Sequence, residues 1–458
     1  MKNVVPTKMG HKLDQIIDET LPSIDRSVQI AKKDFAERWK TVQDAMQQKG
    51  YDLLCFYGNE FERSDGAWLV GFFDPTIESY IVLIPSEGIP IILAGPEGGR
   101  VAEEAARRSG ADIVLVRDFQ IPEEEYRWVL LTEIDEVLNR YLGKGPKRIA
   151  IGSSGTSIPY DLVLKLKDKF GINNIFFDQK LLQRIKYEKS DKELYIMQQA
   201  NKIGDAALRG MLAVLAPNLT ELQAAGAGDY VVKELGGGRT GFSTIVTSGN
   251  RGYTLIGPAT NKIIKKGEIV SLGVGPTFNG YNGVIRRTVR VGAKPTPEQR
   301  QFIRAVEELY VVVMEAVMVA AKDNLPSNHI DKQGRDYLQK LKLRTIKEGL
   351  VTPHETYSFI HNTGCSECQE GYGVVSFCTE RPLGNKVALM IDVALTGFNE
   401  QGEQMFSVPY AVVENAFWKS GQTVGVYNKL SLNVQHLVGS TEQIEEKLSP
   451  YEKEFKMA

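Results

Sequence analysis

Three ionisable residues lie inside apolar stretches in the last quarter of the chain. His361 stands in "YSFIHNTG", Asp392 in "LMIDVAL" and Glu414 in "YAVVENAFW". A carboxylate inside an apolar strand costs free energy unless it is paired, and an imidazole can act as a general acid and base near neutral pH. We interpret His361, with Asp392 and Glu414 beside it, as the candidate catalytic group. The structural alternative is a salt bridge from the carboxylates to Arg286 or Arg287 and a histidine that only donates hydrogen bonds.

Three of the four cysteines fall in one short stretch close to His361. They are Cys365, Cys368 and Cys378, whereas Cys55 stands alone. A thiol beside a histidine can be a nucleophile or contact a substrate, and this group could also bind zinc. One CxxC pair without a second is a weak zinc signal, and ordinary cysteines in a loop beside a pocket are the simpler alternative. We predict Cys365 and Cys368 as substrate contacts and no metal.

A Gly-rich hairpin is predicted at "GEIVSLGVGPTFNGYNGVIRRTVRVG", residues 267–292. Its strands are expected at Glu268–Gly275 and Val284–Gly292, and such a turn often positions functional side chains. Its inward positions offer no negative charge. We expect Tyr281 and Arg286 to bind an anionic or carbonyl group of a small-molecule substrate.

Composition bounds the kind of protein. The chain has 458 residues, 42% hydrophobic and 24% charged, which is ordinary for a globular protein. A formal net charge of −2 gives no reason to expect nucleic acid or an anionic membrane as a partner. The start lacks the apolar run of a signal peptide, and four cysteines do not make a disulfide framework. We predict a cytoplasmic protein.

The first third of the chain alternates between strand and helix patterns. Apolar runs such as "DLLCFYG", "SYIVLIPS" and "ADIVLVRD" alternate with helical patterns at Gly99–Gly110 and Glu125–Leu142. This alternation predicts an α/β domain over about residues 30–180. Ser190, followed three residues later by Glu193, then gives a capping-box pattern that starts a long helix. We therefore predict two domains, residues 1–185 and 186–458.

The second domain combines helices with strands of antiparallel type. Helices are expected at Thr220–Leu235, Gln301–Lys322 and Ile330–Leu341, and a strand-rich end runs from Tyr357 to Trp418. Helices grouped around a curved antiparallel sheet make an α+β domain. The charged end, from Ser440, is predicted to be a solvated surface helix.

Four passages resemble the pita-bread family of aminopeptidase P, prolidase, methionine aminopeptidase and creatinase. "EKSDKELYIMQQANKIGDAAL" is similar to the family's linker and first helix, residues 267–292 to its central hairpin, and "IHNTG" to its His-x-x-Gly strand. "ALMIDVALTGFN" and "VPYAVVENAFW" are similar to its last two strands. The resemblance covers nearly the whole chain. It implies an α/β N-terminal domain, an α+β pita-bread domain and a homodimer.

The resemblance also implies where the metal ligands of the family fall. Its peptidases hold two metal ions with two Asp, one His and two Glu, because a cation pair needs several anionic oxygens. These positions fall on Gly273, Val284, His361, Asp392 and Glu414. Glycine and valine cannot ligate through their side chains, so the resemblance implies that the two-metal site is lost and that no cofactor is used.

Two further family positions also differ. A second histidine, which contacts substrate in the family, is replaced by Cys368. The catalytic histidine of creatinase falls near Ile256 and its substrate-binding glutamate on Arg286, so creatinase activity itself is not supported.

The leading hypothesis is a metal-independent hydrolase or lyase that acts on a small polar non-peptide molecule at a C–N bond. The alternative from another class is a catalytically inactive pita-bread module that binds peptides or proteins, as similar chromatin chaperones do. A third possibility is a single-metal enzyme that uses His361, Asp392, Glu414 and a cysteine.

Overall fold

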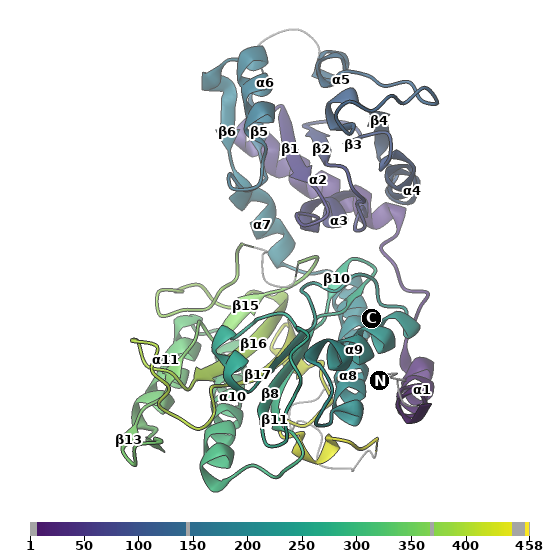
Figure 1. Cartoon of the computed structure of the whole chain (residues 1–458). Coiled ribbons are helices and arrows are strands. Elements are labelled where there is room, and N and C mark those ends of the chain that lie inside the picture. Colours follow the sequence, from purple (N-terminus) through teal and green to yellow (C-terminus); the bar gives the residue numbers. More distant parts are fainter. Residues whose placement is uncertain (1–6, 143–146, 367–370, 442–453, 458) are drawn as a thin grey trace. The chain divides into compact units, whose positions relative to one another are not determined.

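The computed structural model describes residues 7–142, 147–366, 371–441 and 454–457 (Figure 1). Contacts between residues divide them into two compact domains. The smaller domain consists of Gln29–Tyr187 together with Gly371 and Tyr372. The larger domain consists of the described residues up to Val28 and the other described residues from Glu188 onward.

The N-terminal segment departs from the predicted division into residues 1–185 and 186–458. Helix α1 (Thr7–Thr20) packs on α8 (Asp191–Val214) of the larger domain. Leu13 lies against Gly210, and Lys12 Nζ donates a hydrogen bond to the carbonyl of Ala213 (2.8 Å). Because the apolar side of α1 is buried there, the segment before Gln29 belongs to the larger domain.

The smaller domain has the α/β architecture that alternating strand and helix patterns predict. Within the described residues its six-stranded sheet has the order β4-β3-β2-β1-β5-β6. The central pairs β1–β2 and β2–β3 are antiparallel, and the outer pairs are parallel. The strands are β1 (Leu53–Gly58), β2 (Tyr80–Pro85), β3 (Ile91–Ala94), β4 (Asp112–Leu115), β5 (Ile149–Ile151) and β6 (Ile175–Phe177). The helices are α2 (Lys32–Lys49), α3 (Ser64–Val70), α4 (Gly99–Ser109), α5 (Ile134–Leu142), α6 (Tyr160–Phe170) and α7 (Gln179–Tyr187).

One helix of this domain is shorter than predicted. The pattern over Glu125–Leu142 predicts a single helix, but α5 begins only at Ile134. The residues before it form a loop, in which Thr132 N donates to Leu115 O (2.9 Å) and Glu123 has a φ of 67°. Pairing with the end of β4 therefore replaces the local helical preference.

The larger domain is built on an antiparallel sheet, as its α+β pattern predicts. Within the described residues this eight-stranded sheet has the order β14-β16-β17-β11-β8-β7, with β15 also beside β16 and β18 beside β17. Its strands are β7 (Ile245–Ser248), β8 (Ile269–Val274), β11 (Ile285–Arg290), β14 (His354–Glu355), β15 (Ile360–Asn362), β16 (Lys386–Thr396), β17 (Tyr410–Ser420) and β18 (Thr423–Val426). Short pairs form at β9 (Thr277–Phe278) with β10 (Tyr281–Asn282) and at β12 (Leu343–Arg344) with β13 (Leu350–Val351).

Helices pack against this sheet and against one another (Figure 1). Besides α1 and α8 they are α9 (Glu221–Glu234), α10 (Pro297–Asp323) and α11 (Asn328–Lys340). The predicted capping box of α8 is present: Glu193 N donates to Ser190 Oγ (3.2 Å), and Ser190 N donates to Glu193 Oε2 (2.8 Å). Helix α8 contacts β8 and β11, and α10 contacts β16 and β17.

The central hairpin is in register along its whole length. Asn279 and Gly280 form its tip with φ of 47° and 84°, the geometry that an Asn-Gly turn favours. Ile285 faces α8, because it lies against Gly204. Side chains alternate along a strand, so Arg286 projects from the face opposite to α8.

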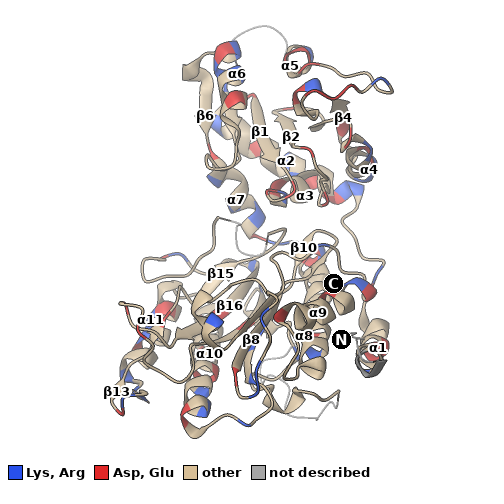
Figure 2. Ribbon diagram, viewed as in Figure 1, with Lys and Arg blue, Asp and Glu red and all other residues tan. Residues whose placement is uncertain are grey.

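The helices and the charged end of the chain bear on two further expectations from the sequence. Within the described residues no helix is both long enough and apolar enough to cross a membrane. The predicted helix of the charged end, from Ser440, falls mostly outside the described residues. Figure 2 shows acidic and basic residues interspersed over the elements of both domains.

Candidate active site

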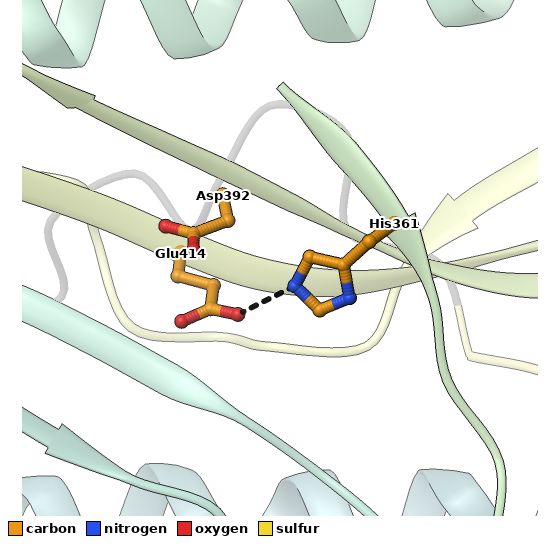
Figure 3. A group of neighbouring side chains, drawn as sticks. All are labelled: His361, Asp392 and Glu414. Atoms are coloured by element: carbon orange, nitrogen blue, oxygen red, sulfur yellow. Dashed lines mark ion pairs between the residues drawn. The ribbon is translucent and has the colours of Figure 1, made fainter. Parts of the chain in front are cut away.

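The three predicted catalytic residues lie together on one face of the larger sheet. Asp392 on β16 is directly opposite Glu414 on β17, and His361 on β15 pairs with Met390, two residues from Asp392. One ligand atom from each of the three lies within 4.8 Å of the others (Figure 3). The sheet register thus brings together three groups that lie 22 to 53 residues apart in sequence.

Arg286 joins this group from the neighbouring strand. It is directly opposite Glu414 in the β11–β17 pair. Its Nη1 lies 3.3 Å from Asp392 Oδ2 and 3.6 Å from Glu414 Oε2. The side chains of all three are at most 9% exposed, so the ion pairs are buried. The salt bridge to Arg286, which the sequence left as the structural alternative for Asp392, is therefore present.

Two tyrosines complete the environment of the guanidinium, and sequence reasoning missed both. Arg286 donates to the hydroxyls of Tyr357 (3.0 Å) and Tyr410 (2.7 Å), which lie 2.8 Å apart. The Tyr357 hydroxyl also donates to Asp392 Oδ1 (2.9 Å). Tyr357 precedes His361 by four residues and Tyr410 precedes Glu414 by four. Even spacing places strand residues on one face, and this signal could have identified Tyr410 on β17, whereas Tyr357 precedes β15 and lies outside any strand.

Burial and charge set the protonation of this cluster. Burial, reinforced by the negative charge of Glu414, raises the pKa of Asp392 to about 7. Burial opposes the charge of Arg286, but the two tyrosines and the two carboxylates hold its pKa above the usual value. Burial likewise raises the pKa of Tyr410 to about 12. At neutral pH the cluster therefore contains a charged arginine and neutral tyrosines.

Gly273 and Val284 lie on the strands that carry Arg286. Gly273 is directly opposite Arg286 in the β8–β11 pair. A Cβ atom on Gly273 would lie 2.6 Å from Arg286 Cγ, so the arginine side chain occupies the space in which a larger residue would stand. Val284 is fully buried, and its backbone N donates to Asn201 Oδ1 (3.1 Å). Neither side chain offers an oxygen or nitrogen atom to a ligand.

His361 is the most exposed member of the group. Its side chain is 15% exposed, whereas that of Glu414 is 1% exposed. The Nε2 atom lies 3.6 Å from Glu414 Oε1, longer than a hydrogen bond, and Nδ1 lies 3.1 Å from the carbonyl oxygen of Asn362. Figure 3 shows the imidazole edge facing the Glu414 carboxylate. The imidazole is thus both near a carboxylate and partly accessible.

The structure also places Tyr281 and Cys365, two further predicted site residues. The hydroxyl of Tyr281 donates to Glu193 Oε1 (3.0 Å) at the start of α8, and its part in substrate binding stays a prediction. Cys365 is buried and Cys378 is exposed, and Cys378 Sγ lies 3.2 Å from Ser376 Oγ. Cys368 lies outside the described residues. The described part of the chain contains one possible metal-binding group, and no cysteine belongs to it.

Comparison with known proteins identifies relatives of this arrangement. Residues 195–391 match the model of metallopeptidase family M24. The chain is 28% identical over 198 residues to the Xaa-Pro dipeptidase of Pyrococcus horikoshii, which is 43% of this chain and 53% of the relative. It is 29% identical over 160 residues to the uncharacterized peptidase YqhT of Bacillus subtilis, 34% of this chain and 43% of the relative. The matches thus span about half the length of these relatives.

Solved structures agree with this assignment at the level of the fold. The prolidase from Pyrococcus horikoshii superposes with a TM-score of 0.68 and 20% identity, covering 88% of this chain and 100% of that one. The X-Pro aminopeptidase from Thermotoga maritima gives a TM-score of 0.67 and 17% identity, covering 87% and 99%. Together with the sheet register, these similarities show that the chain has the pita-bread fold of aminopeptidase P and prolidase, and that its residues 195–391 are similar to metallopeptidase family M24.

Proposed function

We propose that this protein is a hydrolase that acts without a pair of metal ions on a small polar non-peptide substrate, at a C–N bond. The observation that carries the proposal is the position of Arg286, whose guanidinium lies between Asp392 and Glu414. A fixed positive charge there neutralises carboxylates that would otherwise need cations.

The residues of this site do not fit a metal pair. A dinuclear centre needs bridging carboxylates, and the two hairpin positions that would supply them are Gly273 and Val284. Donor atoms of His361, Asp392 and Glu414 are close enough to hold one ion, but Arg286 would have to move from its contacts with the two carboxylates first.

His361 is the group best placed for proton transfer. In this mechanism the imidazole takes a proton from a water molecule, whose oxygen attacks the carbon of the C–N bond, and then gives that proton to the departing nitrogen. Glu414, 3.6 Å away, stabilises the protonated imidazole. Because Arg286 and the two tyrosines occupy the face of the sheet beside it, we expect a small substrate rather than a peptide.

The proposal is tested with protein stripped of metal by a chelator and offered small amides, ureas, guanidino acids and Xaa-Pro dipeptides. We expect release of an amine from a non-peptide compound, resistant to chelator, that falls at least about 100-fold in His361→Gln. His329→Gln, which changes a histidine on α11, is the control and should keep full activity. Cleavage of dipeptides only after Mn²⁺ is added would contradict the proposal.

A binding module without catalysis is the second candidate, and one observation favours it. Hydrogen bonds join Arg286 to Tyr357 and Tyr410, and Tyr357 to Asp392. This arrangement is expected where side chains of the protein occupy the place of a former ligand. In that case no compound of the panel is turned over, and His361→Gln changes nothing measurable.

The expected partners and location belong to the same proposal. We infer a homodimer from the family, a cytoplasmic location from the low cysteine content, and no nucleic-acid or membrane partner from the net charge of −2. Figure 2 shows basic and acidic residues interspersed along the elements drawn, which agrees with this expectation.

A further inference from the structure

The loop between β7 and β8 contains a residue in a rare backbone conformation. Leu255, which follows the 3₁₀ helix Gly249–Thr254, has φ of 59° and ψ of −74°. Ile256 N donates to Thr254 O (2.7 Å), which closes a three-residue γ-turn around Leu255. The γ-turn with positive φ at its centre is rare and strained, and most of all for a residue with a bulky side chain.

Hydrogen bonds on both sides hold the turn in this conformation. Thr254 Oγ1 donates to Arg251 O (2.8 Å), and Arg251 Nη2 reaches across the loop to Pro258 O (2.9 Å). Arg251 is in turn ion-paired with Glu221, which is fully buried. Strain of this kind persists only where the surroundings impose it, and it concentrates at functional sites.

The strained conformation places the carbonyl of Leu255 beside Arg286 and its side chain beside the groups that hold Arg286. Its carbonyl oxygen accepts from Arg286 Nη2 at 3.5 Å. Its side chain packs in the small apolar cluster that contains Tyr410 and Tyr357, the tyrosines that hold the same guanidinium. With negative φ the side chain would leave the other side of the turn, so one of these two contacts would be lost.

We propose that Leu255 is a positioning residue that keeps the Arg286 guanidinium between Asp392 and Glu414. The strained turn presses the carbonyl and the side chain of Leu255 onto Arg286 and its two tyrosines, and the anchored loop supplies the restraint. The inference rests on the proposed role of Arg286 in place of metal ions, but not on any catalytic activity.

The strain is tested by comparing glycine and alanine at position 255. Glycine tolerates positive φ and alanine does not, so Leu255→Gly should unfold at a higher temperature than Leu255→Ala. The matched control is Tyr253 in the same loop, which is 63% exposed and has negative φ. There the alanine variant should be at least as stable as the glycine variant. A Leu255→Ala protein more stable than Leu255→Gly would overturn the strained turn.

The positioning role is tested by hydrogen exchange of arginine side chains, followed by NMR in the ligand-free protein. The Nη–H signals of Arg286, whose Nη2 contacts the Leu255 carbonyl oxygen, are assigned by their loss in Arg286→Lys. We expect these protons to exchange at least tenfold faster in Leu255→Gly than in the unmodified protein. The Nη–H protons of Arg287, whose Nη2 donates to Asn415 Oδ1 (2.9 Å), are the internal control and should keep their rate.

Two outcomes separate a positioning role from general loosening. Equal rates for Arg286 in Leu255→Gly and the unmodified protein would overturn the inference, and so would equal acceleration of Arg286 and Arg287. Because no substrate is present, failure of the proposed hydrolase activity does not change either reading.

Discussion

Arg286 and Gly273 are complementary residues. The Arg286 side chain passes over Gly273 so closely that a Cβ atom there would meet Arg286 Cγ at 2.6 Å. The sequence predicts only part of this packing between Arg286 and Gly273. Sequence indicates that both hairpin positions lack carboxylates, but the β8–β11 register is needed to show that the arginine fills the place left by a missing side chain.

We predict that Gly273→Ala destabilises the fold by about 1–3 kcal/mol, since it forces Arg286 off its preferred conformation. In an Arg286→Ala background the same change should cost little, because the colliding atoms are gone. Denaturant unfolding of the two single variants and the double variant measures the coupling. Purely additive effects would mean that the two residues do not compete for space.

The tyrosines show why part of the site escaped prediction. Tyr357 and Tyr410 look like ordinary aromatic residues of apolar segments, and in the structure Tyr410 is buried and Tyr357 is partly buried. Their role follows only from the hydroxyl contacts with Arg286 and Asp392. His361, Asp392 and Glu414, in contrast, were predictable because an ionisable group in an apolar strand needs a partner.

Elements with strong local signals were predicted closely, and those decided by distant contacts were not. The capping box at Ser190 and the Asn-Gly tip of the hairpin are encoded locally. The segment before α5 has a helical pattern but pairs with β4, and α1 has no local signal that tells which domain it joins. Tertiary contacts, which hydrophobic periodicity does not reveal, therefore determine the start of α5 and the domain that α1 joins.

Helix α10 carries a partly buried carboxylate, Glu307, behind the site-bearing strands, and this group should make the stability of the fold depend on pH. Burial raises the pKa of Glu307 to about 7. A raised pKa in the folded state favours the protonated form, so this contribution is complete below the unfolded pKa of about 4.5 and is lost as pH rises through about 7.

We therefore predict that the unmodified protein loses stability relative to Glu307→Gln between about pH 4.5 and 7, and that the difference is constant above that range. Urea unfolding of both proteins at a series of pH values measures it. A stability difference that does not change with pH would show that Glu307 titrates normally.

At the scale of the whole molecule, the fold class was predictable and the domain limits only partly. Alternating and antiparallel patterns predict an α/β and an α+β domain, and both are present. The boundary at Tyr187 was predictable, because the capping signal at Ser190 marks the start of α8. The residues before Gln29 belong to the larger domain because of their packing alone, which the sequence does not reveal.

The resemblance to the pita-bread family predicts assembly into a homodimer. Sedimentation equilibrium at micromolar concentration should give twice the chain mass of 51.0 kDa. The mass of a single chain at these concentrations would refute the dimer. It would not change the description of the site, whose residues all lie in the larger domain.

The central claim is that the guanidinium of Arg286 stands where the family's peptidases hold cations, and calorimetric titration of the metal-stripped protein with Mn²⁺ tests it most directly. We predict that no pair of ions binds, since two hairpin positions lack ligands and the remaining carboxylates are paired with Arg286. Binding of two Mn²⁺ ions per chain, abolished by Glu414→Gln, would contradict the account.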